Sequence, residues 1–256
     1  MQVRAVCLAV LTAVTAASPA HADTATLPNL VPMPAENVFV ADADQVEDFN
    51  APQPERAVRF GTTTFNMGDY PLDLIFAPGS LADVEQNGRD ILQCTGFVGP
   101  VCTQRTFAGR AFYHGIHGHW HMEAYADYAL LPVTEGGLPD FDAPPVAPGE
   151  KASFCVMDTT ASDDAAATDV ATYATCDSVR QGMTAKHGDT YDRGLYGQQI
   201  VIDDVPPGIY ALVITVDPTD RLSETSRSDN RSWVVIDLAA DRCQDGEVPV
   251  LASGVS

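Results

Sequence analysis

The strongest constraint on the fold lies in the stretch QQIVIDDVPPGIYALVITVDP, residues 198–218. Two runs of mostly apolar and β-branched residues flank Pro206-Pro207-Gly208, a tripeptide that favours a turn. β-Branched side chains fit a pleated sheet better than a helix. We therefore expect two strands joined by this turn. The residues expected in the core are Ile202, Ile209, Leu212, Ile214 and Val216.

Other segments carry the same kind of signal. RAVRFGTTTFNMG, residues 56–68, reads as a strand that ends in a turn, and DYPLDLIFAP, residues 69–78, as a second strand. EKASFCVMDT, residues 150–159, indicates another, and residues 223–239 turn at Asp229-Asn230 into what we expect to be the final strand. We find no convincing long helix and no internal repeat. The expected fold is mainly β, a sandwich-like single domain with long loops and little helix.

The chain divides into four expected parts. Residues 1–22 hold Arg4, an apolar run and a small-residue pattern ending at Ala22, which is typical of a secretory signal peptide cleaved after Ala22. Residues 23–56 are rich in Pro, Ala and acidic residues and are expected to be an extended or disordered lead-in. Residues 57–240 form the main domain, and residues 241–256 a loose tail. We expect a secreted or periplasmic protein.

The net charge of −21 excludes several classes of partner. Such acidity argues against nucleic acid and anionic membranes, and it attracts cations, including amines. Many exported proteins are acidic for solubility alone, so the charge does not select an amine. After the leader no apolar run is long enough to span a bilayer.

Five cysteines follow the leader, and an oxidising compartment favours disulfides over free thiols. Nearness in sequence suggests Cys94–Cys102 and Cys155–Cys176, with Cys243 left over. Sequence alone cannot fix this connectivity.

Histidine is concentrated in YHGIHGHWHM, residues 113–122, which holds four of the six histidines. His117, His119 and His121 alternate along an expected strand, so they project from one face. Imidazole suits copper, zinc, nickel or iron. A flat strand would separate the outer two Cα atoms by about 13 Å, and Gly118 permits a bend that brings the rings closer. His114 is out of phase and is interpreted as a neighbouring polar residue rather than a ligand.

The histidine pattern alone leaves alternatives open. A solvent-exposed polar strand is the less favoured alternative, and a metal-binding module without catalytic activity would carry the same three histidines. Glu123 continues the same face and could orient a ligand imidazole.

The stretch from Tyr113 to Leu131 resembles the copper-binding segment of the lysyl oxidases, in which a histidine precedes a His-x-His-x-His triplet and a later Tyr-x-Leu-Leu. The resemblance returns at GEKASFC, residues 149–155, and at HGDTYDRG, residues 187–194. It continues through VPPGIYALVITVDP and the turn at Asp229-Asn230. In all it covers residues 60–238 in the family's order.

This resemblance implies a copper-dependent amine oxidase domain at residues 57–240. Lysyl oxidases use O2 to convert primary amines to aldehydes, with ammonia and hydrogen peroxide as further products. Their cofactor, lysine tyrosylquinone, joins a lysine to an oxidised tyrosine, which by motif are Lys151 and Tyr191. The implied substrates are peptidyl-lysine or small primary amines. The implied copper ligands are His117, His119 and His121.

A general base is needed to remove the α-proton of the amine. Asp189, two residues before Tyr191, shares its face on an extended segment and is the leading candidate. The alternative is that Asp189 only caps a turn.

The chain departs from the family pattern in several places. Ile116, His187 and Gly197 stand where the animal enzymes have cysteines, so the disulfides must be rewired, and Cys155–Cys176 is a plausible replacement. A family histidine falls near Asp127, which puts any base role at that position in doubt. Two other functions remain open: a non-catalytic secreted copper- or zinc-binding β-sandwich, and a zinc hydrolase, for which no separate carboxylate motif is found.

Overall fold

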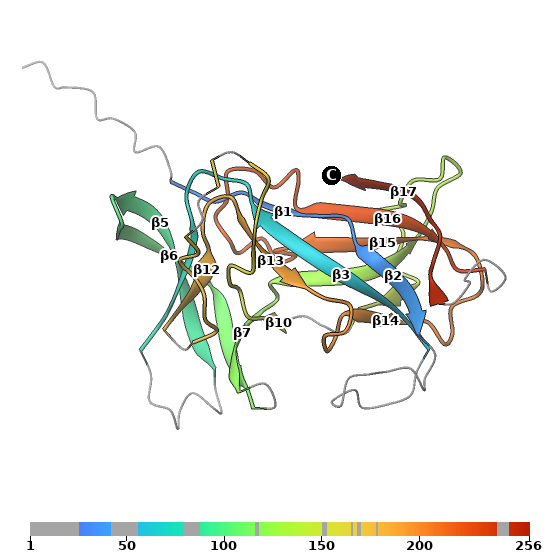
Figure 1. Ribbon diagram of the computed structural model, residues 1–256, viewed down its shortest axis with the longest axis horizontal. Helices are drawn as coiled ribbons and strands as arrows, with labels where there is room; N and C mark the ends of the chain where they lie inside the picture. Colours follow the sequence, from blue (N-terminus) through green and yellow to red (C-terminus); the bar gives the residue numbers. More distant parts are fainter. Residues whose placement is uncertain are drawn as a thin grey trace, which may run out of the picture.

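The computed structural model describes residues 26–41, 56–78, 88–115, 118–149, 153–164, 166–167, 170–177, 179–239 and 246–256. Its regular elements are nearly all strands, arranged in three antiparallel sheets (Figure 1). The expected mainly β fold is confirmed. The signal-peptide residues, Cys243 and two expected site residues, His117 and Lys151, lie outside the described residues.

The first sheet is built around β3 (Ala57–Asn66), the diagonal strand in the middle of Figure 1. Almost every residue of β3 is buried, as the apolar and threonine-rich sequence requires of a central strand. Its neighbours are β1 (Leu30–Pro32), β2 (Glu36–Ala41), β13 (His187–Tyr191) and β14 (Gln199–Val201), and β11 (Thr160–Ala161) pairs with β13.

The second sheet has the order β10-β7-β6-β5-β4-β12 and holds the histidine-rich strand. Its strands are β4 (Leu72–Phe76), β5 (Arg89–Val98), β6 (Val101–His114), β7 (His119–Glu123), β10 (Ser153–Phe154) and β12 (Arg180–Met183). The long β5–β6 hairpin projects at the left of Figure 1 and is closed by the Cys94–Cys102 disulfide, which confirms that expected pairing.

The third sheet has the order β17-β16-β15-β8-β9. Its strands are β8 (Ala126–Pro132), β9 (Ala147–Pro148), β15 (Ile209–Val216), β16 (Arg231–Asp237) and β17 (Val250–Val255). β15 confirms the strand expected after Pro206-Pro207-Gly208. β16 is not the final strand, because β17 pairs along its other edge.

One hydrophobic core receives side chains from all three sheets. β1 lies against β15 and β16, so the first and third sheets face each other as the layers of a sandwich. Phe60 of β3 packs edge-on against Tyr128 of β8, with ring centroids 5.0 Å apart. Burial of one such aromatic side chain stabilises the fold by about 1.5–3 kcal/mol. This contact fixes how β3 packs against β8.

Three expectations about the chain need correction. Residues 30–41 were expected in an extended or disordered lead-in, yet they contain β1 and β2, both paired with β3. The tail expected to be loose contains β17. Pairing with a neighbouring strand orders these segments, and β2 also holds Val38, Phe39 and Val40, which favour a strand. Ile209 is 46% exposed at the end of β15, whereas Leu212, Ile214 and Val216 are buried as expected.

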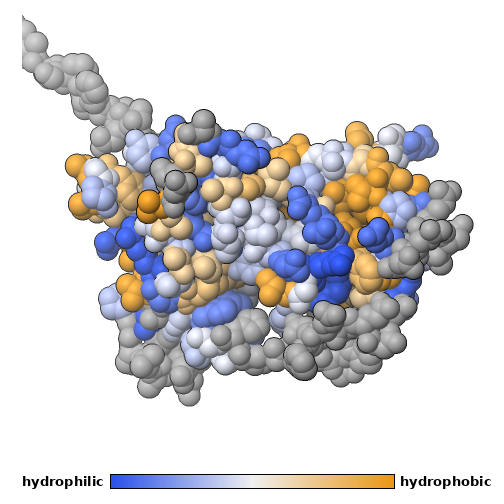
Figure 2. Space-filling model, in the orientation of Figure 1, coloured by the Kyte–Doolittle hydropathy of each residue, from blue (hydrophilic) through white to orange (hydrophobic). Residues whose placement is uncertain are grey.

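The surface view shows where apolar side chains remain accessible (Figure 2). One area covers the tip of the β5–β6 hairpin, where Val98 and Val101 are exposed. Another lies over the third sheet, where Val250 and Leu251 are exposed. None of the described residues belongs to a helix long and apolar enough to cross a membrane.

Candidate active site

The β6–β7 hairpin presents the histidines. Gly118 adopts a positive φ of 71°, and its amide donates to the carbonyl of His114 at 2.8 Å, which closes the turn. This left-handed conformation suits glycine and supplies the bend expected at this position. His119 and His121 follow on β7, two residues apart, and therefore project from the same face of the strand.

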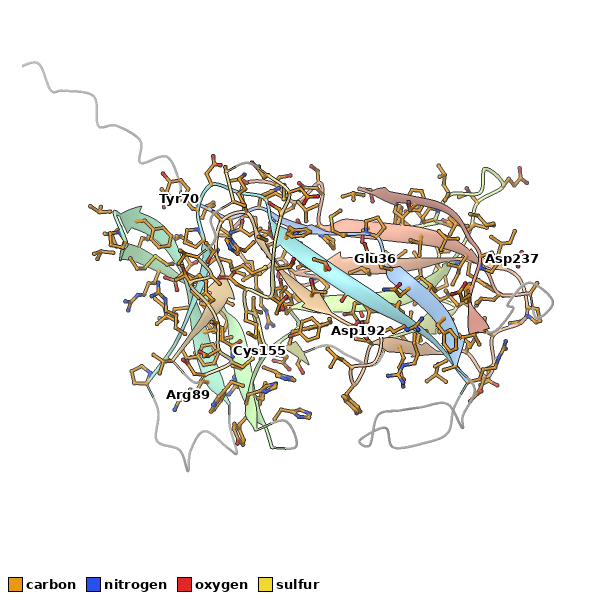
Figure 3. All side chains as sticks on the ribbon, in the orientation of Figure 1. Glu36, Tyr70, Arg89, Cys155, Asp192 and Asp237 are labelled. Atoms are coloured by element: carbon orange, nitrogen blue, oxygen red, sulfur yellow. A yellow bond between two sulfur atoms is a disulfide. The ribbon has the colours of Figure 1, made fainter. Side chains whose placement is uncertain are left out.

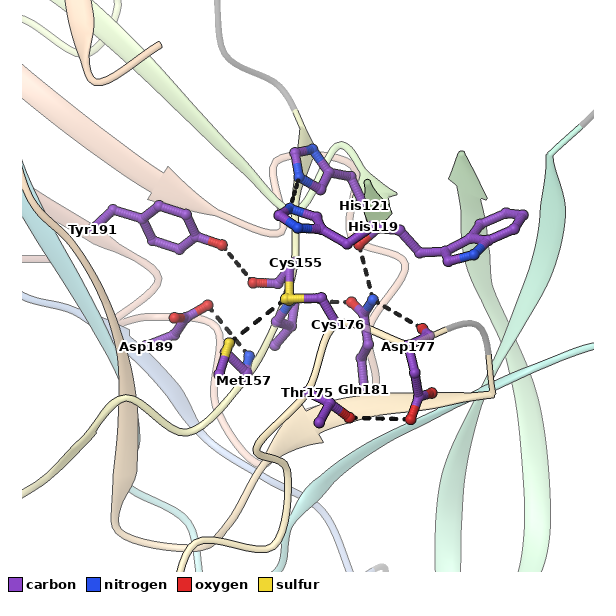
Figure 4. The surroundings of a disulfide bond; sticks show 12 residues. His119, His121, Cys155, Met157, Thr175, Cys176, Asp177, Gln181, Asp189 and Tyr191 are labelled. Atoms are coloured by element: carbon purple, nitrogen blue, oxygen red, sulfur yellow. Dashed lines mark hydrogen bonds between the residues drawn. A yellow bond between two sulfur atoms is a disulfide. The ribbon is translucent and has the colours of Figure 1, made fainter. Parts of the chain in front are cut away.

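The two imidazoles converge. Nε2 of His119 and Nε2 of His121 lie 2.8 Å apart, and Nδ1 of His121 contacts the hydroxyl of Ser153 at 3.3 Å (Figure 4). Two Nε2 atoms aimed at one point fit a metal ion that prefers imidazole, and the Ser153 contact fixes the ring orientation of His121. Two imidazoles suit copper, and they suit zinc, nickel or iron as well.

The structure differs from one to the next of the other residues expected near the histidines, which are His117, His114 and Glu123. Within the part of the chain that the structure describes, no group of three or more metal-binding side chains is found, and the third ligand, His117, lies outside that part. His114 pairs directly with His119 across the hairpin and stacks on His121, with centroids 5.0 Å apart. Spacing along one strand therefore gave the wrong phase for His114, because antiparallel pairing returns it to the same face. Glu123 is exposed, and the described contact to His121 comes from Ser153 instead.

Strand β13 supplies the second half of the site. His187, Asp189 and Tyr191 share one face of this strand. Asp189 is only 3% exposed and accepts the amide of Met157 at 3.4 Å. Burial, followed by the charge of Asp189, raises the pKa of Tyr191 well above its ordinary value. The Tyr191 hydroxyl therefore stays protonated at neutral pH.

A short segment, residues 153–155, joins the two halves. Ser153 and Phe154 form β10, which pairs with β7, and the hydroxyl of Ser153 reaches His121. Two residues later the carbonyl of Cys155 accepts the Tyr191 hydroxyl (Figure 4). Figure 3 shows Cys155 between the sheet at the left and the remainder of the fold. One extended segment therefore contacts both His121 and Tyr191, and Lys151 lies two residues before it in sequence.

The Cys155–Cys176 disulfide holds this segment in place, and its presence confirms the second expected pairing. The carbonyl of Cys176 accepts the amide of Trp120, the residue between His119 and His121, at 3.3 Å. The disulfide thus ties the segment to β7 from a second side.

Aromatic rings form the floor of the site. The ring of Phe154 makes edge contacts with Tyr125, Tyr128 and Tyr191, at centroid distances of 5.6, 6.0 and 5.1 Å. The sequence argument missed Tyr125 and the role of Ser153. Neither carries a motif that would mark it, since a buried tyrosine reads as core and Ser153 lies inside a motif defined by Lys151.

Asp127, the position where the family has a histidine, is exposed on β8, whereas its neighbours Ala126 and Tyr128 are buried. Its side chain therefore points away from the face that carries Tyr128. Partial burial raises the pKa of Asp127 above its ordinary value. The geometry gives no support to a base role at this position.

A lysyl oxidase family model matches residues 97–244, more than half of the chain. The chain belongs to the lysyl oxidase family. The matched residues include the histidine hairpin, the segment from Lys151 to Cys155 and strand β13. Every residue of the candidate site therefore lies in the part that the lysyl oxidases share.

Individual lysyl oxidases are similar over the same region. Lysyl oxidase homolog 2 of Gallus gallus is 33% identical over 147 residues, which is 53% of this chain and 17% of that protein. Protein-lysine 6-oxidase of Gallus gallus is 33% identical over 46% of this chain and 26% of its own length. Lysyl oxidase homolog 1 of Homo sapiens is 34% identical, over 46% and 19%. The matched region is thus about a quarter or less of each relative's length.

Proposed function

We propose that the chain is a copper- and quinone-dependent amine oxidase. It would convert peptidyl-lysine side chains or small primary amines to aldehydes, with O2 as oxidant and with ammonia and hydrogen peroxide as products. The observation that carries the proposal is the segment 153–155, which contacts His121 through Ser153 and Tyr191 through Cys155. A metal ion held by the histidines and the ring of Tyr191 would thus lie against the same segment, residues 153–155.

His117, His119 and His121 would hold the copper, and Lys151 would be joined to Tyr191 as lysine tyrosylquinone. The copper would support oxidation of the tyrosine ring by O2, and the quinone would supply a carbonyl group that is reactive toward primary amines. The protein's part is to place and orient these groups. The contact from Ser153 holds the imidazole of His121, and the Cys155 carbonyl holds the phenol of Tyr191 before oxidation.

Asp189 would act as the general base for the α-proton of the amine. It lies on the same face of β13 as Tyr191, inside the protein, where water does not compete for the proton. The amide of Met157 holds one carboxylate oxygen, which directs the group. If Asp189 only capped a turn, it would not need to lie on a strand with only 3% of its surface exposed.

Copper loading of the purified protein in the presence of O2, followed by peptide mass analysis, tests the proposal. We expect a crosslinked peptide that joins Lys151 to Tyr191. Separate, unmodified peptides after loading would refute it and would favour a copper-binding sandwich without catalysis.

Three variants test the cofactor role of Tyr191 and the metal-binding role of His119. Tyr191→Phe should abolish amine oxidation and keep copper binding, whereas His119→Ala should lose both. Tyr210→Phe is the matched control, because the Tyr210 hydroxyl is held by the Pro206 carbonyl on an exposed turn. Retained oxidation in Tyr191→Phe would contradict the cofactor assignment.

We also propose that the protein is exported and that residues 57–240 contain the catalytic unit, with β1 and β2 as structural additions. Two disulfides among the described residues favour an oxidising compartment. Sequencing the N-terminus of the protein recovered outside the cytoplasm tests cleavage after Ala22, and a start at Met1 would contradict it.

A further inference from the structure

A buried arginine holds the loop of residues 192–197, which follows Tyr191 and leads from β13 to β14. Arg59 of β3 is only 6% exposed. Its guanidinium donates to the backbone carbonyls of residues 193–195, at 3.1, 3.5 and 3.4 Å. A buried cation is costly unless hydrogen bonds satisfy it, and these three bonds all go to the loop. The interior of the fold therefore keeps this loop in one shape.

The loop has restraints of its own. The carboxylate of Asp192, labelled in Figure 3, accepts the amide of Gly194 at 2.9 Å. Gly197 adopts a positive φ of 76°, a conformation that suits glycine. The guanidinium of Arg193 lies over the ring of Phe39, 5.1 Å from its centroid. The charged side chains of the loop are therefore engaged by other groups of the protein.

Two apolar side chains of the loop face outward beside the candidate site. Leu195 is 46% exposed and Tyr196 is 36% exposed. The ring of Tyr196 lies 6.5 Å from the ring of His114, and His114 stacks on His121 with centroids 5.0 Å apart. The loop therefore extends from Tyr191, at the end of β13, to the hairpin that carries the histidines.

We propose that Leu195 and Tyr196 form an apolar rim of the amine site and select primary amines with an aromatic or long alkyl chain. The carbon chain of such an amine would lie against these two side chains, because burying apolar surface there is favourable and aromatic rings attract one another. An amine with a second charged group would have to bring that charge against the same apolar side chains, which is unfavourable. The inference rests on the proposed function, since it names the substrate class of that site.

Charge alone does not make this selection. The net charge of −21 attracts every cationic amine, whether it carries one charged group or two. The rim would therefore separate one amine from another after the overall charge has attracted both.

Steady-state kinetics of the copper-loaded protein test the rim with benzylamine, ethylamine and diaminobutane. The wild type should have its highest kcat/KM with benzylamine. Tyr196→Ala should lower the ratio of kcat/KM for benzylamine over ethylamine about tenfold, whereas Tyr196→Phe keeps a ring and should retain the preference. Tyr70→Ala is the matched control, because Tyr70 is also an exposed tyrosine, stacked on Phe97 of the β5–β6 hairpin.

A binding measurement gives a readout that does not depend on oxidation. Cumylamine is a benzylamine whose α-carbon carries two methyl groups and no hydrogen, so it cannot be oxidised to an aldehyde. Titrated into metal-free protein, it should shift the NMR signals of Leu195 and Tyr196. It should bind about tenfold more weakly to Tyr196→Ala, whereas tert-butylamine, which lacks the ring, should not distinguish the variant from the wild type.

An unchanged cumylamine affinity in Tyr196→Ala overturns the proposal, and so does a wild type that prefers diaminobutane to benzylamine. If Tyr196→Ala does not fold, Leu195→Ser decides on the same criteria. A protein that forms the crosslink and oxidises no amine, or that forms no crosslink, refutes the proposed function. The cumylamine titration then still decides whether the rim exists.

Discussion

Glu224→Gln should make the free energy of unfolding less dependent on pH. Glu224 accepts the amide of Leu30 at 2.8 Å and the side-chain amide of Asn230 at 2.9 Å. Burial is the largest cause that raises its pKa from 4.5 to about 7, and the charge of Asp217 adds to it. Two segments far apart in sequence thus meet on a carboxyl group that resists ionisation.

The sign and size follow from the shift. An acid with a raised pKa in the folded state binds its proton more tightly there than in the unfolded chain. Its stabilising contribution is therefore complete below pH 4.5 and is lost as the pH rises toward 7. At about 1.4 kcal/mol per pH unit, the full loss is about 3 kcal/mol, of which roughly 2–3 kcal/mol falls between pH 5 and pH 8.

Glutamine keeps the shape and cannot ionise. Its oxygen still accepts the Leu30 amide. Its NH2 group can donate to the Asn230 oxygen, which is buried and has no partner among the residues that the structure describes, once the Asn230 amide rotates. The variant should therefore gain stability relative to the wild type as the pH rises.

Urea unfolding of wild type and variant at pH 5 and pH 8, in chelator-treated protein, measures the effect. The difference between the two proteins should change by roughly 2–3 kcal/mol. The exposed Glu135→Gln should show no such change. A pH-independent difference for Glu224→Gln would refute the linkage.

Three further predictions concern separate features. Ser153→Ala should weaken copper binding about tenfold in calorimetry, because the His121 ring loses its orienting contact; unchanged affinity would contradict that role. Arg180→Ala should lower the free energy of urea unfolding by about 3 kcal/mol, since Asp73, fully buried, loses two bonds of 2.6 and 2.8 Å; a change under 1 kcal/mol would count against it. Gly182→Ala should prevent folding or cost more than about 4 kcal/mol, because its Cβ would lie 2.0 Å from a neighbouring carbonyl oxygen; a wild-type thermal midpoint would contradict the strand geometry.

Local sequence patterns predicted the strands that contain long apolar and β-branched runs of their own. β3 and β15 carry long apolar and β-branched runs, and both formed where expected. β1 contains proline and β17 contains glycine, and they are strands because a partner strand offers hydrogen bonds. No local pattern contains that information.

The candidate site, too, was predicted from the sequence only in part. The motifs indicated His119, His121, Asp189 and Tyr191, and the fold places the histidines together and the other two on one strand. His114 was assigned the wrong phase, because pairing across a turn is not visible in spacing along one strand. The ligand roles of His117, His119 and His121, the base role of Asp189 and the link between Lys151 and Tyr191 stay predictions.

β3 pairs on its edges with β1 and β2, which precede it, and with β13 and β14, which follow it much later in the chain, and this has a consequence for how the protein tolerates cutting. Residues 26–41 are attached to β3 by the β1 and β2 ladders and by the buried side chains of Leu30 and Val40. A nick between Ala41 and Ala57 would therefore give a two-piece protein whose smaller piece stays bound. Washing that piece away would uncover β3, the strand on which Asp189 and Tyr191 are aligned. Residues 26–41 could then be supplied as a synthetic peptide to restore the fold.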